Sequence, residues 1–503
     1  MIVSTRIKPN LYKDSVALMR IAEKLLADPA ILRATLVMGT PANKDILEEA
    51  GLLAPEAAAA APSDLIVAVE SRDSAAIDAA FASVDESLSA AAPVHGEAGR
   101  ETPARSIGMG RARLDAANIV QISVPGAYAG AEALKAVKAG LNVFLFSDNV
   151  PVEQERAIKL LAQKKGLLVM GPDCGTAIIG GVPLGFANVV RRGRIGLVGA
   201  SGTGLQEVSS QIHQLGEGVS HAIGAGGRDV AAEIGAITMS MALDLLAADA
   251  GTSVIGIVSK PPAPEVMRRL VVRAGKAGKP VVLLFIGGEA HKLPKNVHAA
   301  ESLYGCAAAC VALARGAKKP DAEVAAAAAP KVRFAPGAKY LRGLYSGGTF
   351  CGEAQLVLRA AGVHCWSNVP LDKSRSLADP GRSQEHTLID LGEGDFTVGR
   401  PHPMIDPSTR VARIAQEAAD PQTAVLLLDV VLGYGAHADP AGALAGAITR
   451  ARKSRELPVV AFVCGTEGDP QVRSKQEAKL AAAGCIVAPS STQAARAAAL
   501  LVA

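Results

Sequence analysis

The sequence predicts a multidomain α/β protein, and three observations support this fold class. The chain has 503 residues, of which 49% are hydrophobic, which is enough for about three or four domains of roughly 100–200 residues each. Apolar strand-like runs alternate with helix-like runs along most of the chain. Several of the apolar runs end in glycine-rich turns. This pattern is typical of parallel sheets with helices on both faces.

The first block, residues 1 to about 92, predicts a small α+β unit of ferredoxin-like size. Its strands are IVSTRIK, ATLVMG and DLIVAVE, and its helix-like runs are SVALMRIAEKLLA, NKDILEEAG and SAAIDAAFASVDESL. Residues 91–107 are rich in Ala, Pro, Gly and charged side chains, which indicates an exposed linker. The N-terminal domain and its linker therefore span residues 1–107.

Three further blocks repeat the alternation of strand and helix. The second covers residues 108–192, and the third covers 193–315 with the strands RIGLVGA, GVSHAIGAG, VIGIVSK and PVVLLFIGG. An Ala/Pro/Lys-rich segment, 316–337, is a candidate linker. The fourth block, 338–503, begins with a new strand and glycine turn and ends with the strands LPVVAFVCGTEGD and CIVAPSS.

The glycine-rich turns are the candidate binding elements. Each follows an apolar run and is expected to open a helix; the residues are Ser201, Gly202, Thr203, Gly347, Gly348, Thr349, Gly433, Gly435, Gly226 and Gly227. Backbone N–H groups and the helix dipole favour an anion at such a point. An ordinary N-cap explains the same residue types. No Gly-Lys-Ser/Thr follows the glycines, so none of these turns is a Walker A loop.

Composition excludes several classes of function. The formal net charge is +4, and no basic run with interleaved aromatic residues occurs, so we expect no nucleic-acid binding. No run of about 18 apolar residues lacks charges or glycines, so we expect no membrane span. The seven cysteines are scattered without a CxxC pair. This usage indicates a reducing, cytoplasmic setting and no metal site.

Long and unusual strings in the chain resemble known proteins. The stretch ISVPGAYAGAEALKAVKAGLNVFLFSDNVPVEQE with GPDCGTAI resembles the CoA-binding domain of the succinyl-CoA synthetase α subunit. The third block resembles the ligase domain of that subunit, with ASGTGLQE at its phosphate-binding turn, and 338–503 resembles the carboxyl domain of the β subunit. The chain also resembles the FdrA family over nearly its whole length. The order of its blocks is similar to that family, and so are the strings VMGTPANKDIL, YSGGTFCGEA, DLGEGDFTVGRPHPMIDP and CGTEGDPQ.

This resemblance implies a fold and an activity. The implied fold is a Rossmann-like domain of the CoA-binding type over 108–192 and two flavodoxin-like, synthetase-type domains over 193–315 and 338–503. The FdrA family is associated with carbamoyl transfer in purine-derived allantoin breakdown. The implied reaction interconverts oxamate plus carbamoyl phosphate with oxalurate plus phosphate. Partner subunits of the same pathway and a homo-oligomer are expected.

The cofactor expectations follow from what the resemblance lacks. No ATP-grasp domain separates the α-like blocks from the β-like block, so we do not expect ATP to bind. The strand and glycine loop that grip CoA in the synthetase are not recognisable, which leaves CoA binding open. We expect that this chain itself requires no cofactor.

The candidate catalytic residues are Arg400 and His402 in FTVGRPHPMIDP, where two prolines stiffen the backbone. Arg400 is suited to bidentate binding of a carboxylate or phosphate, and His402 is suited to protonating a leaving group or donating to an oxyanion. The alternative is a structural loop whose arginine pairs with Asp406 or Asp395. Because parallel sheets bind ligands at the carboxyl ends of their strands, we expect the active centre between the third and fourth blocks.

Further candidates are weighed against ordinary structural roles. Asn43 and Lys44 open a helix after a strand and could face a ligand or a domain interface, and Arg228 with Asp229 in GAGGRDV could bind substrate. His298, in KNVHAAESLYG, is the candidate for a phosphohistidine, and a solvated residue at a helix start is its alternative. Two other functions therefore stay open: an acyl-CoA synthetase with a phosphohistidine step, and a non-catalytic organising subunit.

Overall fold

The computed structural model describes residues 2–11, 13, 15–40, 43–44, 47–48, 50–89, 103–288, 292–320, 331–397 and 400–503. Its contacts divide the chain into two compact units. The first holds Met1–Pro103 and Gly394–Pro401, and the second holds Ala104–Glu393 and His402–Ala503. Most of the linker expected at 91–107, and the middle of the one expected at 316–337, lie outside the described residues.

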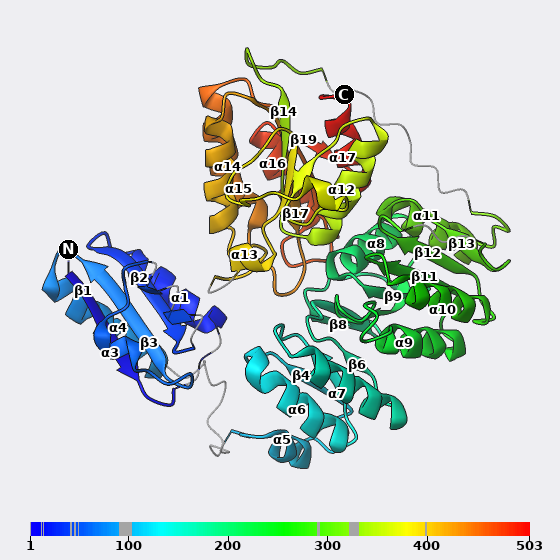
Figure 1. The fold of residues 1–503 in the computed structure, drawn as a ribbon, viewed down its shortest axis with the longest axis horizontal. Coiled ribbons are helices and arrows are strands. Elements are labelled where there is room, and N and C mark those ends of the chain that lie inside the picture. Colours follow the sequence, from blue (N-terminus) through cyan, green and yellow to red (C-terminus); the bar gives the residue numbers. More distant parts are fainter. Residues whose placement is uncertain are drawn as a thin grey trace. The chain divides into compact units, whose positions relative to one another are not determined.

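The first unit is built on a three-stranded sheet (Figure 1). Its strands are β1 (Ile2–Lys8), β2 (Ile31–Met38) and β3 (Leu65–Ser71), and β3 lies in the middle, antiparallel to both neighbours. The helices are α1 (Ser15–Leu26), α3 (Pro55–Ala58), α4 (Ser74–Ser89) and α13 (Gly394–Thr397), of which α13 comes from the later segment of the unit. Strands β1 and β2, which are joined by α1, are separated in the sheet by β3, and this is a split β-α-β arrangement. The predicted α+β unit is therefore confirmed. Of the helix predicted at NKDILEEAG, residues 43–44 and 47–48 are helical, and residues 45, 46 and 49 lie outside the described residues.

The second unit begins with a small parallel sheet in the order β4–β5–β6 (Figure 1). The strands are β4 (Ile119–Ile122), β5 (Asn142–Leu145) and β6 (Val169–Met170). The helices are α5 (Ile107–Arg113), α6 (Gly126–Lys138) and α7 (Val152–Lys164), and α6 packs on β4 and β5. Alanines at 129, 133 and 136 on α6 are fully buried, which lets this helix approach the sheet closely.

A seven-stranded sheet follows, in the order β13–β12–β11–β9–β10–β7–β8. Its strands are β7 (Thr176–Ile179), β8 (Val182–Gly185), β9 (Arg192–Ala200), β10 (Val219–Gly224), β11 (Val254–Ser259), β12 (Val281–Phe285) and β13 (Val297–Ala299). The helices are α8 (Gly202–Gln214), α9 (Ile237–Ala248), α10 (Pro264–Gly275) and α11 (Leu303–Ala314). Strands β7 and β8 pair antiparallel at one edge, so this sheet already begins within 108–192.

A six-stranded, all-parallel sheet ends the chain, in the order β15–β16–β14–β17–β18–β19. The strands are β14 (Tyr340–Tyr345), β15 (Trp366–Ser367), β16 (Thr387–Asp390), β17 (Thr423–Val431), β18 (Val459–Cys464) and β19 (Ile486–Ala488). The helices are α12 (Gly348–Ala360), η1 (Lys373–Arg375), α14 (Ser408–Ala419), α15 (Pro440–Ser454), α16 (Arg473–Ala482) and α17 (Ser491–Ala499).

The two large sheets share one hydrophobic core because their helices pack on each other. Helix α8 contacts α12, and α11 contacts α17. Figure 1 shows α8 and α11 on the side of their sheet that meets the C-terminal domain. The buried cluster runs from Leu205 on α8 through Phe350 on α12 to Phe462 on β18. This packing confirms the predicted α/β class with parallel sheets, and it brings the first helix of each sheet together.

Two of the predicted turns do not open a helix directly. The turn at Gly226 is followed by α9 only at Ile237, and Gly226 itself adopts φ 81° against the carbonyl of Pro172. The turn at Gly433 is followed by α15 only at Pro440, where Asp439 caps the helix. The expectation was wrong there because a loop of several residues intervenes. None of the helices in the described stretches has the length and apolarity needed to cross a membrane.

Candidate functional site

Helix α8 begins at the carboxyl end of β9, near the middle of its sheet. Ser201 is the N-cap with φ −160°, and its Oγ accepts a hydrogen bond from the Gly204 N–H at 3.2 Å. The first turn of a helix leaves several N–H groups without partners inside the helix, so those of Gly202 and Thr203 remain for other acceptors. Ser201 and Thr203 are both buried. The local sequence therefore builds a capped helix end inside the protein.

Helix α12 begins in the same way after β14, but its N-cap is Gly347, which offers no side chain. The residue before it, Ser346, is held by Asp429 of β17. The Asp429 carboxylate accepts the Ser346 N–H at 3.0 Å and its Oγ–H at 2.9 Å. Arg410 pairs with Asp429 at 2.8 Å, and both side chains are buried. A buried ion pair thus fixes the turn that leads into α12.

The two helix ends meet each other. Ser201 Oγ and Thr349 Oγ1 are 2.5 Å apart. A Cβ at Gly347 would lie 2.7 Å from Thr203 Cγ2, which is closer than a real Cβ approaches, so only glycine fits there. The structure therefore brings the Ser201 and Gly347 turns into contact. Two positive helix ends directed at one place favour an anion between them.

A carboxyl group stands beside this helix pair. Asp390 ends β16 and is 3% exposed. Its Oδ1 accepts the Gly392 N–H at 2.9 Å, and its Oδ2 lies 2.5 Å from the place of a Cβ at Gly348. Burial raises the pKa of Asp390 to about 7, Glu393 and Asp429 add to this, and the Gly392 N–H and Lys260 oppose it. This side chain therefore titrates near neutral pH at the start of α12.

His402 lies close to the same point. Its Nε2 is 2.6 Å from the position of a Cβ at Gly392, and Asp390 Oδ1 is 3.1 Å from that position. Its Nδ1 accepts the Met404 N–H at 3.2 Å, which leaves Nε2 to carry the proton of the neutral ring. Burial lowers the pKa of His402 to about 4, and Arg410 contributes. His402 is therefore a neutral hydrogen-bond donor.

Phe186, which follows β8, connects these residues. Its ring centroid lies 5.8 Å from that of His402. Its carbonyl accepts the Thr176 hydroxyl at 2.8 Å, and Thr176 Oγ1 lies 3.4 Å from the place of a Cβ at Gly202. A Cβ at Gly435 would lie 3.0 Å from the Phe186 ring. One contact chain therefore links Gly202, His402 and Gly435.

Gly433 is used differently from the other predicted glycines. Its N–H donates to Gln471 Oε1 at 3.0 Å, and its backbone approaches the Ala187 carbonyl with φ 110°. This N–H is therefore engaged within the protein, and glycine is needed for the close approach. Phosphate binding by Gly433 and Gly435 stays a prediction.

Asp229 belongs to a buried charge cluster at the start of α9, and the partly exposed Arg228 lies at its edge. Asp229 accepts from Lys159 Nζ at 2.7 Å and from the N–H groups of Thr238 and Met239 in the first turn of α9. Arg228 pairs with Glu155 at 3.0 Å. Asp229 is fully buried. Asp229 therefore caps α9 and pairs with Lys159, and substrate binding by Arg228 and Asp229 stays a prediction.

Three of the remaining candidates belong to the first unit and one lies on a strand of the seven-stranded sheet. Arg400 is exposed, its N–H donates to the Thr397 carbonyl, and it groups with the first unit. Within that unit, Asn43 Nδ2 donates to the Met38 carbonyl and Lys44 Nζ to the Ala58 carbonyl, both at 2.8 Å. His298 is in β13, three strands from β9 in the seven-stranded sheet, which is roughly 14 Å at the usual strand spacing.

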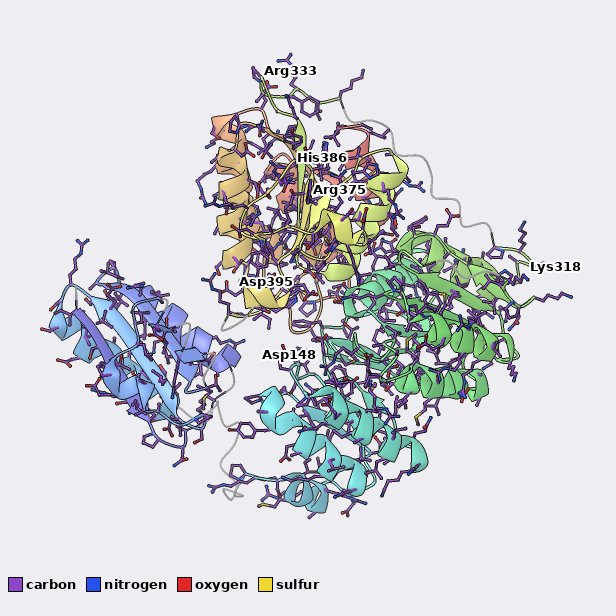
Figure 2. All side chains as sticks on the ribbon, in the orientation of Figure 1. Asp148, Lys318, Arg333, Arg375, His386 and Asp395 are labelled. Atoms are coloured by element: carbon purple, nitrogen blue, oxygen red, sulfur yellow. The ribbon has the colours of Figure 1, made fainter. Side chains whose placement is uncertain are left out.

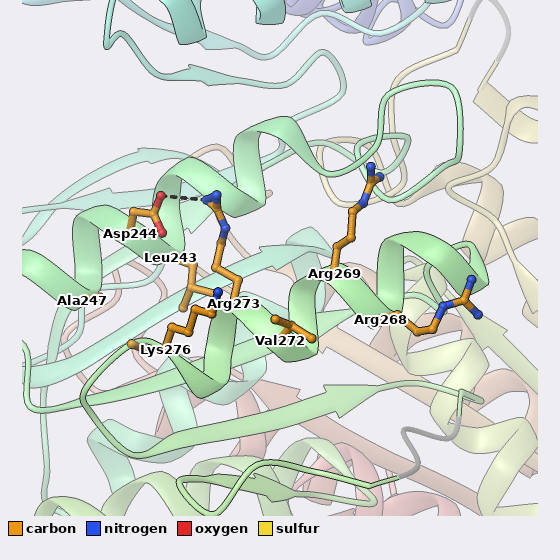
Figure 3. A pocket seen from close by; sticks show the side chains of 9 residues that line it. Leu243, Asp244, Ala247, Arg268, Arg269, Val272, Arg273 and Lys276 are labelled. Carbon is orange, nitrogen blue, oxygen red and sulfur yellow. Dashed lines mark hydrogen bonds and ion pairs between the residues drawn. The ribbon is translucent and has the colours of Figure 1, made fainter.

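A separate groove on the second unit lies away from these residues. It runs between α9 and α10, has a volume of about 510 Å³ and carries Arg268, Arg269, Arg273 and Lys276 (Figure 3). Arg273 is paired there with Asp244 at 2.8 Å. No residue predicted from the sequence lines this groove.

Sequence reasoning missed Asp390, Asp429 and Phe186. Asp390 ends the apolar run TLID, at the carboxyl end of a parallel strand, where ligands bind; that position was a usable signal. Asp429 lies inside a wholly buried strand, and Phe186 lies in an irregular segment. Nothing local to either residue marks it. Figure 2 shows how dense the side chains are throughout the second unit, with Asp148 in the loop after β5.

Comparison with known families gives three matches. Residues 1–104 match the family "AllF, heavy metal-associated domain", residues 190–287 match "CoA binding domain", and residues 344–501 match "CoA-ligase". The CoA-binding match falls on the block likened above to the ligase domain. The CoA-ligase match covers the six-stranded sheet that carries α12.

Several known proteins are similar to this chain. The uncharacterized protein YahF of Escherichia coli (strain K12) is 41% identical over 98% of this chain and 97% of its own length. The succinate–CoA ligase [ADP-forming] subunit alpha-2 of Trichomonas vaginalis is 32% identical over 24% of this chain and 40% of its own length. The ADP-forming sulfoacetate-CoA ligase subunit SauD of Bilophila wadsworthia is 27% identical over 44% of this chain and 74% of its own length. Among solved structures, an acetyl-coenzyme A synthetase from Ca. Korarchaeum cryptofilum aligns over 76% of this chain and 82% of its own at 16% identity, with a TM-score of 0.32.

The name of the N-terminal family implies a heavy metal, and the residues present do not fit one. Soft metals favour thiolate and imidazole ligands, and residues 1–94 contain neither cysteine nor histidine. In the described stretches, no group of three or more His, Cys, Asp or Glu side chains could hold a metal ion.

The remaining matches agree with one another. The AllF-type match is N-terminal and the two synthetase-type matches follow it, in the order of the blocks of this sequence. YahF aligns along nearly the whole length of the chain. The chain belongs to the FdrA family, whose domains are related to those of the succinyl-CoA synthetase subunits.

Proposed function

We propose that this protein is a subunit of an acid–thiol ligase-type enzyme that exchanges an acyl group between phosphate and a thiol. The reaction is acyl phosphate plus CoA giving acyl-CoA plus phosphate, and it is reversible. The observation that carries the proposal is the contact between the α8 and α12 N-termini through Ser201 and Thr349. Two convergent helix ends stabilise the charge that develops on departing phosphate.

The proposed phosphate site uses the candidates near the helix pair. Ser201, Gly202 and Thr203 would hold phosphate from one side, and Gly348 and Thr349 from the other. His402, a neutral donor through Nε2, would hydrogen-bond an oxyanion. Binding of a substrate carboxylate by Arg400, which belongs to the first unit, stays a prediction.

The proposed substrate is a small acid with a second anionic group. The named relatives act on succinate and sulfoacetate, and both molecules carry two acidic groups. An arginine fork suits the second group because it binds carboxylate bidentately. Arg400→Lys keeps the charge and loses the fork, so turnover should fall by roughly tenfold or more while the melting temperature stays unchanged.

The direct test measures the phosphate-dependent release of the free CoA thiol from succinyl-CoA in the presence of partner subunits. Gly347→Ala places a methyl group against Thr203 and should lower turnover by roughly a hundredfold. Gly110→Ala is the matched control, since a Cβ there meets nothing within 4 Å. Full activity in Gly347→Ala would refute the site.

Carbamoyl transfer is the second candidate, and the position of His298 favours it. With His298 three strands from β9, carbamoyl phosphate would supply activated phosphate without a phosphohistidine. The test is phosphate release from carbamoyl phosphate with oxamate, with and without partner subunits. A mass increase of one phosphoryl group after incubation with acetyl phosphate, lost in His298→Ala, would instead support the phosphohistidine route.

The non-catalytic alternative makes a separate prediction. If partner chains carry the chemistry, His402→Ala and Arg400→Ala should leave the activity of the complex within a few-fold of the original.

A further inference from the structure

The acid group beside α12 is in an unusual place for a carboxylate at an anion site. Asp390 Oδ2 lies against Gly348, the first residue of α12, and the side chain is 3% exposed. An ionised carboxylate there would occupy the positive helix end and repel phosphate. A protonated carboxyl would instead donate a hydrogen bond to a phosphate oxygen.

The groups around Asp390 leave its charge only partly balanced. Glu393 follows it, Lys260 comes from the loop after β11, and Asp429 faces it from β17 with Arg410 of α14 as its partner. His402 stands on the other side of Gly392 and is neutral. Lys260 reaches Glu393 only at 3.9 Å. Among the described residues, Asp390 therefore has two acidic neighbours and no ion pair of its own.

Resting on the proposed function, we infer that Asp390 is the proton carrier of the site, protonated when phosphate or another oxyanion occupies the helix pair. In the forward step the thiol sulfur attacks the acyl carbon, and the bond from that carbon to the phosphate oxygen breaks. The oxygen keeps the electron pair and takes the proton of Asp390. The thiol proton then restores Asp390, so the products are the thioester and hydrogen phosphate.

This role couples anion binding to proton uptake. Burial brings the pKa of Asp390 to about 7 before an anion arrives, and a bound dianion raises the pKa further because like charges repel. Linkage then requires that anion affinity falls as pH rises through 7. Between pH 6 and pH 8 the expected loss is about tenfold.

Sulfate is the best probe because, unlike phosphate, it does not titrate in this range. In calorimetry, wild-type protein should bind sulfate about tenfold more weakly at pH 8 than at pH 6. Titrations in buffers of different ionisation enthalpy should show uptake of nearly one proton per sulfate at pH 8 and almost none at pH 5.5. This measurement needs no variant.

Asp390→Asn separates binding from catalysis. The amide donates a hydrogen bond as the protonated acid does and cannot transfer a proton, so sulfate affinity should become independent of pH while turnover falls by roughly a hundredfold. Asp115→Asn, at an exposed acid, controls for net charge and should leave both unchanged.

The outcomes distinguish the two proposals. If wild-type protein binds no sulfate at pH 6, the anion site and the proposed function both fail. If sulfate binds with the same affinity at pH 6 and pH 8 and without proton uptake, the site stands and the role of Asp390 is refuted. Wild-type turnover in Asp390→Asn would also refute it.

Discussion

Two clusters of buried charge in the second unit have opposite chemistry. In the first, Lys159 lies between Glu155 at 2.8 Å and Asp229 at 2.7 Å, and all three side chains are inaccessible to solvent. In the second, Glu207 of α8 and Glu353 of α12 are buried together. The first cluster pairs each carboxylate with a cation, whereas the second holds two acids in one core.

The acid cluster is satisfied mainly by neutral donors. Glu207 accepts from the Ser491 N–H and from Gln211, and its Oε2 has no partner among the described residues. Glu353 accepts from the Ser491 and Thr492 hydroxyls and from the Leu303 N–H. Burial raises the pKa of Glu207 to about 7, and Glu353 contributes. Burial also raises the pKa of Glu353.

The comparison distinguishes carboxylates that are held ionised by a cation from acids whose protonation can change near neutral pH. The paired cluster ties α7 to the N-terminus of α9, and Lys159 also donates to the Ala225 carbonyl directly after β10. The acid cluster lies on α8 and α12, the two helices whose ends meet at Ser201 and Thr349. Acids held near neutral pKa are concentrated at functional sites more often than elsewhere.

The largest expected effect comes from breaking the paired cluster. Lys159→Met should lower the free energy of unfolding by about 3–5 kcal/mol, because the buried carboxylate of Asp229 loses its cation and that of Glu155 keeps only Arg228. Urea denaturation measures this. Lys135→Met removes a lysine from an exposed pair with Glu132 and should cost less than about 1 kcal/mol. Equal losses in the two variants would overturn the contrast between buried and exposed pairs.

A smaller effect on the free energy of unfolding, one that depends on pH, is expected from the acid cluster. The folded pKa of Glu207 lies above its unfolded value, so its contribution to stability is complete below about pH 4.5 and is lost as pH rises through 7. Glu207→Gln should remove this loss. The gain in the free energy of unfolding of the variant over the original protein should be larger at pH 8 than at pH 5 by on the order of 2–3 kcal/mol.

Denaturation curves at pH 5 and pH 8 test this prediction. Glu233→Gln, at an exposed acid, is the control and should leave the difference between the two pH values unchanged. If Glu207→Gln also leaves it unchanged, Glu207 is ionised at both pH values and the two clusters do not differ as described.

The smallest effect concerns the helix ends themselves. Ser201 caps α8 with its hydroxyl, whereas Gly347 caps α12 without a side chain. Ser201→Ala should therefore lower stability by about 1 kcal/mol through the lost cap and should weaken sulfate binding at pH 6. A stability change without any change in sulfate affinity would show that Ser201 is an N-cap only.

Much of the architecture could be read from local patterns. The apolar runs RIGLVGA and VLLLDVVLGYG became β9 and β17, and the glycine turns at Ser201 and Gly347 became helix N-termini. The same reasoning failed at Gly226 and Gly433, because a strand followed by glycine does not specify how many residues precede the next helix. Those two turns are set by close approach to Pro172 and Ala187.

The sequence by itself determined the class of fold, the order of the domains and two helix ends suited to an anion, since hydrophobic period and glycine content act over a few residues. Only the tertiary structure decided which groups stand together at those ends. Asp390 and His402 are twelve positions apart and meet around Gly392, while Phe186 reaches His402 from another sheet. Burial in that packed setting, and not residue type, moves the pKa of Asp390 up to about 7 and that of His402 down to about 4.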